Sequence, residues 1–281
     1  MNHHLTLDLV LPGIHKLPSL PTVVMELLAL LDQDDANVDA LAGKIAQDQA
    51  LAAKTLRLAN SSFYGMAQQV KTIQEAIGIL GFRTVRSLGT TSALMAAFAK
   101  STPASFNATP FWRHAVAAAV CARELANHLG LNSEQAYTTG LLHDIGRLVL
   151  VSQFHAGYEA TMAYRARHDC HLLQAERAVL GLDHAEVGAA LARHWNFPQA
   201  MQLAVAGHHT PEIAGASRLA LVILAADAIA HALDMSKHED DLVPPVPTGL
   251  WAQLELDENK LPAIFAATEA QFAAASLALN N

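Results

Sequence analysis

Helical periodicity runs through most of this chain and constrains its fold more than any other feature. Apolar residues recur at three- and four-residue spacing, whereas the alternating apolar and polar runs typical of strands are nearly absent. In the first half, this spacing predicts helices over residues 26–32, 38–47, 51–59, 72–79 and 84–99. In the second half, it predicts helices over residues 110–129, 133–151, 157–167, 172–180, 184–195, 198–207, 216–233 and 262–277. The sequence therefore predicts an all-α protein.

Two helical subdomains are expected to pack together. A stretch rich in Ser, Thr, Pro and Asn between Lys100 and Pro110 predicts the joint between them. We expect an N-terminal helical subdomain over residues 1–105 and a second helical subdomain over residues 106–235. Residues 236–281 are expected to form a charged, proline-rich surface loop and the terminal helix.

Composition narrows the environment and the partners of the chain. No stretch approaches the roughly 18 uninterrupted apolar residues of a transmembrane helix, so no membrane association is expected. The first residues lack the basic segment and apolar run of a secretory signal. Two cysteines are too few for a disulfide scaffold and favour a cytoplasmic protein. A net charge of −8 argues against binding of a nucleic-acid polymer.

Histidine is unusually frequent, with 15 residues, and His143 adjoins Asp144 at the end of an apolar helix. A buried carboxylate is costly unless a cation or hydrogen-bond donors compensate it. Taken alone, the pair is more simply explained by a hydrogen bond in the core. The same half also contains five further candidates of the same chemistry, which are His114, His184, His208, His209 and Asp227. Each alone suits a structural role, but their occurrence together favours one shared set of metal ligands.

Three segments of the first half resemble HDOD (HD-related output) domains. They are Leu17–Pro21, Asp48–Tyr64 and Ile73–Gly81, and with the second half the resemblance covers about residues 14–235. It implies a signal-transduction module that acts mainly by binding a signalling protein partner or a small phosphorylated ligand.

The order His, His-Asp, His, His-His, Asp resembles the HD-domain superfamily of metal-dependent phosphohydrolases, and its spacing is most similar to the HD-GYP phosphodiesterases. This resemblance implies an HD-like helical bundle that holds two divalent ions. One ion would be held by His114, His143, Asp144 and Asp227, and Asp144 would bridge to a second ion that is completed by His184, His208 and His209. Imidazoles and carboxylates without thiolates favour iron, manganese, nickel, zinc or cobalt.

Catalytic roles are also implied by the resemblance, for Asp144 and Arg147. Arg147 stands where the phosphodiesterases carry a lysine, and it either binds a phosphate or pairs with a surface acid. His231, one helical turn beyond Asp227, is expected to support the ligands as a donor, whereas the other histidines outside the ligand set are assigned to surface or helix-end positions.

Two departures keep the function open. No Gly-Tyr-Pro triplet follows His209, and Pro110 replaces a glutamate that recruits a third metal in some relatives. A signalling module that works by binding and a phosphohydrolase that acts on a nucleotide or cyclic dinucleotide are both compatible with the sequence, and a helical scaffold with coincidental histidines is a third reading. Because metal-binding features are more developed than substrate-binding ones, we favour the signalling module.

Overall fold

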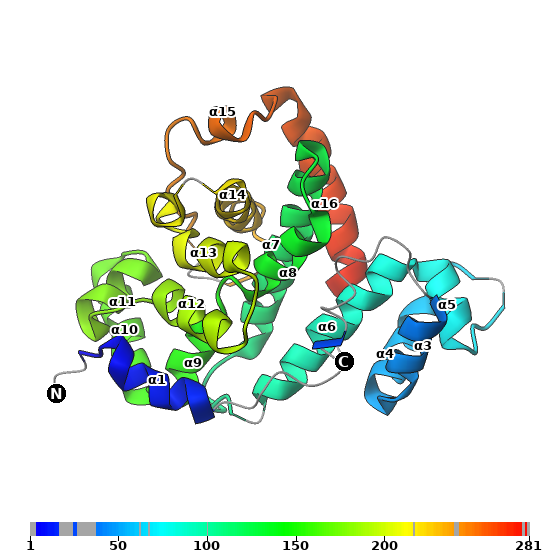
Figure 1. Cartoon of the computed structure of the whole chain (residues 1–281), viewed down its shortest axis with the longest axis horizontal. Coiled ribbons are helices and arrows are strands. Elements are labelled where there is room, and N and C mark those ends of the chain that lie inside the picture. The colour runs from blue at the N-terminus through cyan, green and yellow to red at the C-terminus, as the bar shows by residue number, and fades with distance from the viewer. Residues whose placement is uncertain are drawn as a thin grey trace. The chain divides into compact units, whose positions relative to one another are not determined.

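The computed structural model describes residues 4–16, 25–26, 38–61, 63–66, 68–99, 101–215, 217–238, 242–276 and 279. Within these ranges all regular elements are helices, which confirms the predicted all-α class (Figure 1). The Leu17–Pro21 motif and most of the predicted helix over 26–32 lie outside the described residues.

Contacts divide the chain into two compact units. Unit 1 contains residues 1–19 and 101–268, and unit 2 contains residues 20–100 and 269–281. The division near residue 100 lies where the polar stretch begins. The two ends of the chain differ from the expected boundaries, because the first residues cluster with the second half and the last residues with the first half.

Unit 2 is built from four described helices of its first segment: α3 (Val38–Ala46), α4 (Gln49–Ala59), α5 (Ile73–Leu80) and α6 (Phe82–Ala99). Ile45, Leu51 and Leu58 lie in one buried core together with residues from all four helices. Asn60 caps the end of α4. Its side chain donates to the Val70 carbonyl over 2.9 Å and accepts from the Val70 amide over 2.8 Å, which fixes the following turn.

Unit 1 contains the remaining helices. They are α1 (Leu7–Lys16), α7 (Ala108–Leu129), α8 (Ser133–Leu142), α9 (Ile145–Gln153), α10 (His155–His168), α11 (Leu172–Leu180), α12 (His184–His194), α13 (Gln199–Gly207), η1 (Pro211–Ala214), α14 (Arg218–Ala232), α15 (Leu250–Leu254) and η2 (Glu258–Lys260). Helix α16 (Leu261–Ser276) begins in unit 1 and ends in unit 2. Helices α7 and α14 are buried over most of their length and pack on each other and on α8 (Figure 1). Helix α12 packs against α9 and α13, and α13 packs against α14. The apolar helices α7 and α14 therefore form the core of this unit.

The prediction of one helix over residues 133–151 is wrong, because the chain breaks into α8 and α9. The break falls at His143 and Asp144, where Asp144 has φ −94° and ψ 7°. Apolar spacing continues across this turn, so periodicity alone does not reveal it. Helix α1 was not predicted either, because Val10 and Ile14 are its only buried apolar residues among neighbours that are largely exposed, and because it contains Pro12.

Two glycines allow neighbouring helices to approach closely beside this break. A β-carbon at Gly146 would collide with the carbonyl oxygen of His184 and would lie 2.6 Å from the Gly188 nitrogen. At Gly140, a β-carbon would lie 2.9 Å from the Ala119 α-carbon. Side chains larger than hydrogen are therefore excluded where α9 meets α12 and where α8 meets α7, and this holds the His143–Asp144 turn next to the start of α12.

Candidate metal centre

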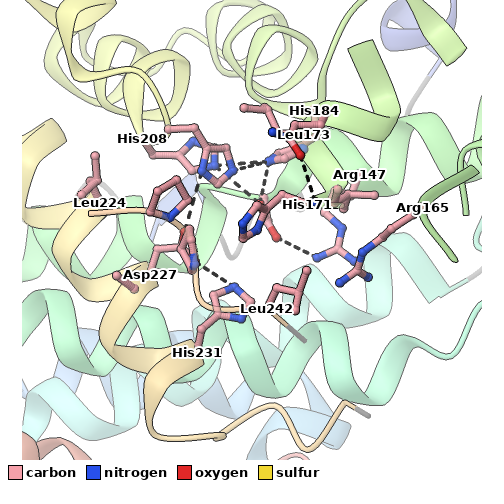
Figure 2. Close-up of a pocket in the computed structure, with 17 residues that line it drawn as sticks. Arg147, Arg165, His171, Leu173, His184, His208, Leu224, Asp227, His231 and Leu242 are labelled. Atoms are coloured by element: carbon pink, nitrogen blue, oxygen red, sulfur yellow. Dashed lines mark hydrogen bonds and ion pairs between the residues drawn. The ribbon is translucent and has the colours of Figure 1, made fainter. Parts of the chain in front are cut away.

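All seven predicted ligands converge in unit 1, although they come from separate elements, and Figure 2 draws the five of them that line the pocket. They are His114 on α7, His143 and Asp144 in the turn between α8 and α9, His184 at the start of α12, His208 and His209 after α13, and Asp227 on α14. Six of them are buried, and the side chain of His209 is 19% exposed. The structure thus brings together groups that lie up to 113 residues apart, from 114 to 227.

One part of the cluster surrounds the carboxylate of Asp144. Its Oδ1 atom lies 3.2 Å from Nε2 of His184 and 3.6 Å from Nε2 of His208. Nε2 of His184 also lies 3.0 Å from Nε2 of His209 and 3.3 Å from Nε2 of His208. One nitrogen or oxygen from each of these four residues fits within 4.8 Å of the others.

A second part surrounds Asp227. Its Oδ1 atom lies 3.0 Å from Nε2 of His114, 3.6 Å from Nε2 of His143 and 3.3 Å from Nε2 of His231. His143 links the two parts, because its Nε2 lies 3.5 Å from Oδ1 of Asp144 and 3.2 Å from Nε2 of His114. The proximity of His231 to Asp227 agrees with its expected place beside the ligands, and its ring packs on that of His114 with centroids 4.3 Å apart.

Hydrogen bonds on the far side of two rings fix which nitrogen faces the cluster. Nδ1 of His143 lies 2.7 Å from the Gly140 carbonyl, and Nδ1 of His208 lies 2.7 Å from the Val205 carbonyl. A carbonyl only accepts, so each Nδ1 carries its proton and donates. When neutral, each ring therefore presents the lone pair of Nε2 to Asp144, which is the tautomer that binds metal.

Such a gathering of lone pairs beside two carboxylates requires positive charge. Burial lowers the pKa of His184, but the carboxylates of Glu176 and Asp144 outweigh it and hold that pKa well above its usual value. Burial raises the pKa of Asp144, yet the charges of His143 and His184 hold it well below its usual range. The pKa of Asp227 is also well below its usual range, against the effect of burial, because of His231 and the hydrogen bond from His114.

Protons supply that positive charge in the metal-free protein, and divalent ions would supply it more completely. Burial and the neighbouring His208 hold the pKa of His209 well below its usual value, so this ring is a neutral ligand already. A donor set of imidazoles and carboxylates suits divalent transition metals. The residues present therefore fit the metal that the HD pattern implies.

Arg147 pairs with a buried acid rather than a surface one. Its Nη1 donates to Oδ2 of Asp144 over 2.9 Å, and its guanidinium group lies over the Phe111 ring at 5.5 Å from the centroid. This contact uses the Asp144 oxygen opposite to the one that faces the histidines. Arg147 therefore orients Asp144 while part of its side chain, 18% exposed, still reaches the pocket.

Glu176 is a site residue that the sequence analysis missed. It is fully buried on α11, and its Oε2 accepts from Nδ1 of His184 over 2.6 Å and from the backbone nitrogen of His184 over 3.0 Å. The sequence did contain a signal for its burial. Glu176 lies four residues after Leu172 and four before Leu180, a spacing that places it on the same helix face as these leucines. Asp183 caps α12, because its side chain accepts a hydrogen bond from the Glu186 nitrogen.

A pocket with a volume of about 140 Å³ opens beside the cluster. Besides five of the predicted ligands, it is lined by Arg147, Arg165, His171, Leu172, Leu173, Gln174, Leu224, Ala228, His231, Leu242, Pro244 and Pro245 (Figure 2). His171 was expected at the surface or at a helix end, and it lines this pocket as the residue before α11. The residues expected as a surface loop also supply part of the wall.

The helical fold and the His-Asp cluster are of the HD type, and comparison with known proteins makes this more specific. Residues 17–211 match the HDOD domain, and the chain belongs to the HDOD family. A solved structure of a provisionally assigned phosphohydrolase from Shewanella amazonensis is 30% identical, with a TM-score of 0.73, and 96% of this chain and 97% of that chain are covered. An HDOD domain protein of unknown function from Geobacter sulfurreducens shares the fold, with 23% identity, a TM-score of 0.75 and coverage of 94% and 98%.

Curated relatives are longer than this chain. An uncharacterized protein of Treponema pallidum is 28% identical over 200 residues, which are 70% of this chain and 38% of that protein. Ribonuclease Y of Thermus thermophilus is 32% identical over 127 residues, which are 45% of this chain and 17% of the enzyme. This chain thus spans well under half the length of both relatives. Among its described helices, none combines the length and the hydropathy needed to cross a membrane.

Proposed function

We propose that this chain is an HDOD signal-transduction module that holds a pair of divalent transition metal ions and acts by binding a signalling protein partner or a small phosphorylated ligand. The convergence of Nε2 atoms on Asp144 carries the proposal. The Nε2 atoms of His143, His184 and His208 all lie within 3.6 Å of one Asp144 oxygen, and lone pairs gathered in this way repel unless a cation lies among them.

The proposed ligands divide into two sets that share Asp144. The first set is His114, His143, Asp144 and Asp227, and the second is Asp144, His184, His208 and His209. His231 lies close enough to His114 and Asp227 to support or join the first set. Iron, manganese, nickel and zinc suit these donors. When bound, the ions would activate a water molecule and neutralise negative charge on a phosphate.

The protein's own residues preorganise this site. Arg147 fixes the Asp144 carboxylate, and Glu176 fixes both the tautomer and the orientation of His184. Helices α7 and α14 bury His114 and Asp227, which are 3% and 2% exposed. Arg147 is thereby engaged with a ligand, so the pocket offers fewer groups for a substrate than for a metal. Because the groups suited to a metal outnumber those suited to a substrate, we favour a binding module.

A phosphohydrolase is the second candidate. The complete donor set favours it, as does the 30% identity to a protein named as a phosphohydrolase. In this case Asp144 and Arg147 would be catalytic, with Arg147 placed beside the phosphate of a nucleotide or cyclic dinucleotide.

Hydrolysis of a generic phosphodiester distinguishes the two functions. The metal-loaded protein and its Asp144→Asn variant are incubated with bis(4-nitrophenyl) phosphate and manganese, and release of nitrophenolate is followed. A binding module gives the same background rate for both proteins. Turnover in the wild type that is at least about a hundredfold above the variant contradicts the binding module and establishes the phosphohydrolase.

A further inference from the structure

Three imidazoles surround one oxygen of Asp227. Its Oδ1 atom lies 3.0 Å from Nε2 of His114, 3.6 Å from Nε2 of His143 and 3.3 Å from Nε2 of His231 (Figure 2 shows the last of these contacts). His114 and His143 belong to the first proposed ligand set, whereas His231 was expected only to support it. One ligand atom from each of His114, Asp227 and His231 lies within 4.8 Å of the others. His231 is therefore placed in the same way as the two assigned imidazoles.

The carboxylate oxygen that His231 faces separates a ligand from a supporting donor. Asp144 provides the comparison within the same cluster, because its Oδ1 faces the histidines while Arg147 donates to Oδ2 over 2.9 Å. Arg147 thus supports a ligating carboxylate from the oxygen turned away from the other ligands. His231 does the opposite, since its Nε2 faces the Asp227 oxygen around which the other lone pairs gather.

Helix α14 provides the spacing that a pair of ligands requires. Asp227 and His231 are four residues apart, so their side chains project from the same face of the helix. The two histidines of the His-Glu-x-x-His zinc motif have the same separation on one helix. On α7, the ring of His114 packs on that of His231 with centroids 4.3 Å apart. This contact holds the imidazole of His231 beside Asp227.

His231 lies on the pocket side of this group. Its side chain is 16% exposed and lines the pocket together with Asp227, which is 2% exposed. Among the described residues around the pocket, His114 and His143 are not part of its lining. A ligand that enters from the pocket therefore meets His231 before it meets these two imidazoles. The second proposed set is open to the pocket through three histidines, which are His184, His208 and His209.

We infer that His231 is a direct ligand of the ion on the Asp227 side and not only a donor that supports Asp227. The donors of this ion are then His114, His143, Asp144, Asp227 and His231. Structural metal sites are closed by protein ligands, whereas sites that bind exchangeable ligands keep an open position. Five protein donors close the Asp227 side more completely than four close the other ion, so exchangeable ligands bind at the other ion. This inference rests on the proposed function, because it adds a ligand to one of the two proposed ions.

Cobalt(II) loading of the full chain tests the assignment, because the visible absorption bands of this ion report the number and type of its ligands. His231→Gln keeps an N–H donor for Asp227 but removes the imidazole. We expect one of the two cobalt ions to show shifted bands and at least about tenfold lower affinity in competition with a chelator. The matched control is His171→Ala, which removes a partly buried histidine of the same pocket that is in none of the ligand groups among the described residues. This variant is expected to behave as the wild type.

Exogenous imidazole distinguishes a ligand from a structural side chain. In His231→Gly the missing ring leaves space for free imidazole, which is expected to restore both the bands and the affinity of the affected ion. Azide tests the closed side in the wild type. It is expected to shift the bands of the ion that His231→Gln leaves unchanged, and to shift the bands of both ions in His231→Gly without imidazole.

The outcomes separate this inference from the proposed function. A protein that binds two cobalt ions, and whose His231→Gln variant keeps the wild-type bands and affinity, overturns the inference alone. Equal loss of both ions in this variant, no rescue of His231→Gly by imidazole, or azide binding to both ions of the wild type also overturns it. A wild-type protein that binds less than about one equivalent of cobalt overturns the proposed function and the inference with it.

Discussion

His184 begins helix α12 and contacts both a buried glutamate and the candidate metal cluster. Its backbone nitrogen and Nδ1 both contact Oε2 of Glu176, and its Nε2 lies among Asp144, His208 and His209. Burial of Glu176 without a charged partner is costly, so the short 2.6 Å contact with His184 explains how this acid is accommodated in the core. Glu176 therefore holds both the first residue of α12 and the imidazole of His184, a candidate metal ligand, in place.

Replacement of Glu176 by glutamine tests this coupling. The amide oxygen still accepts a hydrogen bond, so the fold is retained, but the negative charge that makes His184 a stronger ligand is lost. We expect metal affinity to fall about 10- to 100-fold, measured by competition with a chelator. Glu186→Gln is the matched control, because Glu186 is exposed and lies two residues beyond His184. Equal affinities for the two variants contradict this role of Glu176.

Metal affinity is also expected to depend on pH. The pKa values of His143 and His184 are raised in the metal-free protein, against the effect of burial, by the carboxylates Asp144 and Glu176 respectively. A raised pKa keeps the proton to higher pH, and a ligand nitrogen must lose its proton before it binds metal. Affinity therefore rises as pH rises from about 6.5, the ordinary histidine value. Titrations in buffers of different ionisation enthalpy should show proton release, and a pH-independent affinity contradicts this account.

At the scale of elements, close contact between α9 and α12 places the two central ligand groups together. Gly146 provides that contact, because a β-carbon there would collide with the backbone of His184. The His143–Asp144 turn lies just before Gly146 in the chain, so any separation of the two helices would also move Asp144 away from His184. Backbone approach rather than side-chain packing sets this geometry.

Gly146→Ala is therefore expected to destabilise the protein by about 1–3 kcal/mol or more and to lower metal binding with it. Gly78→Ala is the control, because Gly78 lies in helix α5 with nothing within 4 Å of the added methyl group. In that open helical position alanine is expected to be neutral or stabilising by up to about 1 kcal/mol. Denaturant unfolding of both variants measures the difference, and equal stabilities contradict the close-approach argument.

Sequence periodicity predicts most helices because each of them buries one apolar face. Helix α11 has the predicted bounds, and α12 begins at His184, as predicted. Periodicity fails where a feature depends on tertiary contact. The break at His143–Asp144 interrupts no apolar pattern, and Glu176 has its partner eight residues away in a different helix. These features become visible only when α9, α11 and α12 are placed in space.

For the whole molecule, the candidate site was predictable because its residues have unusual chemistry and a recognisable order. All seven predicted ligands meet in unit 1, and His231 lies beside Asp227 as expected. The pocket wall was not predictable in the same way. Arg165, His171 and residues 242–245 carry no shared pattern along the sequence, and only the fold brings them to the same cavity. The lining of this pocket is the part that sequence order alone does not encode.

Metal stoichiometry of the purified protein tests the shared role of Asp144 most directly. Elemental analysis of the wild type is expected to give about two equivalents of transition metal per chain, because Asp144 joins both proposed ligand sets. Asp144→Asn should lose most of both ions while the helical circular dichroism signal is retained. A wild-type protein with less than about one equivalent, or an Asp144→Asn variant that keeps both ions, contradicts the account.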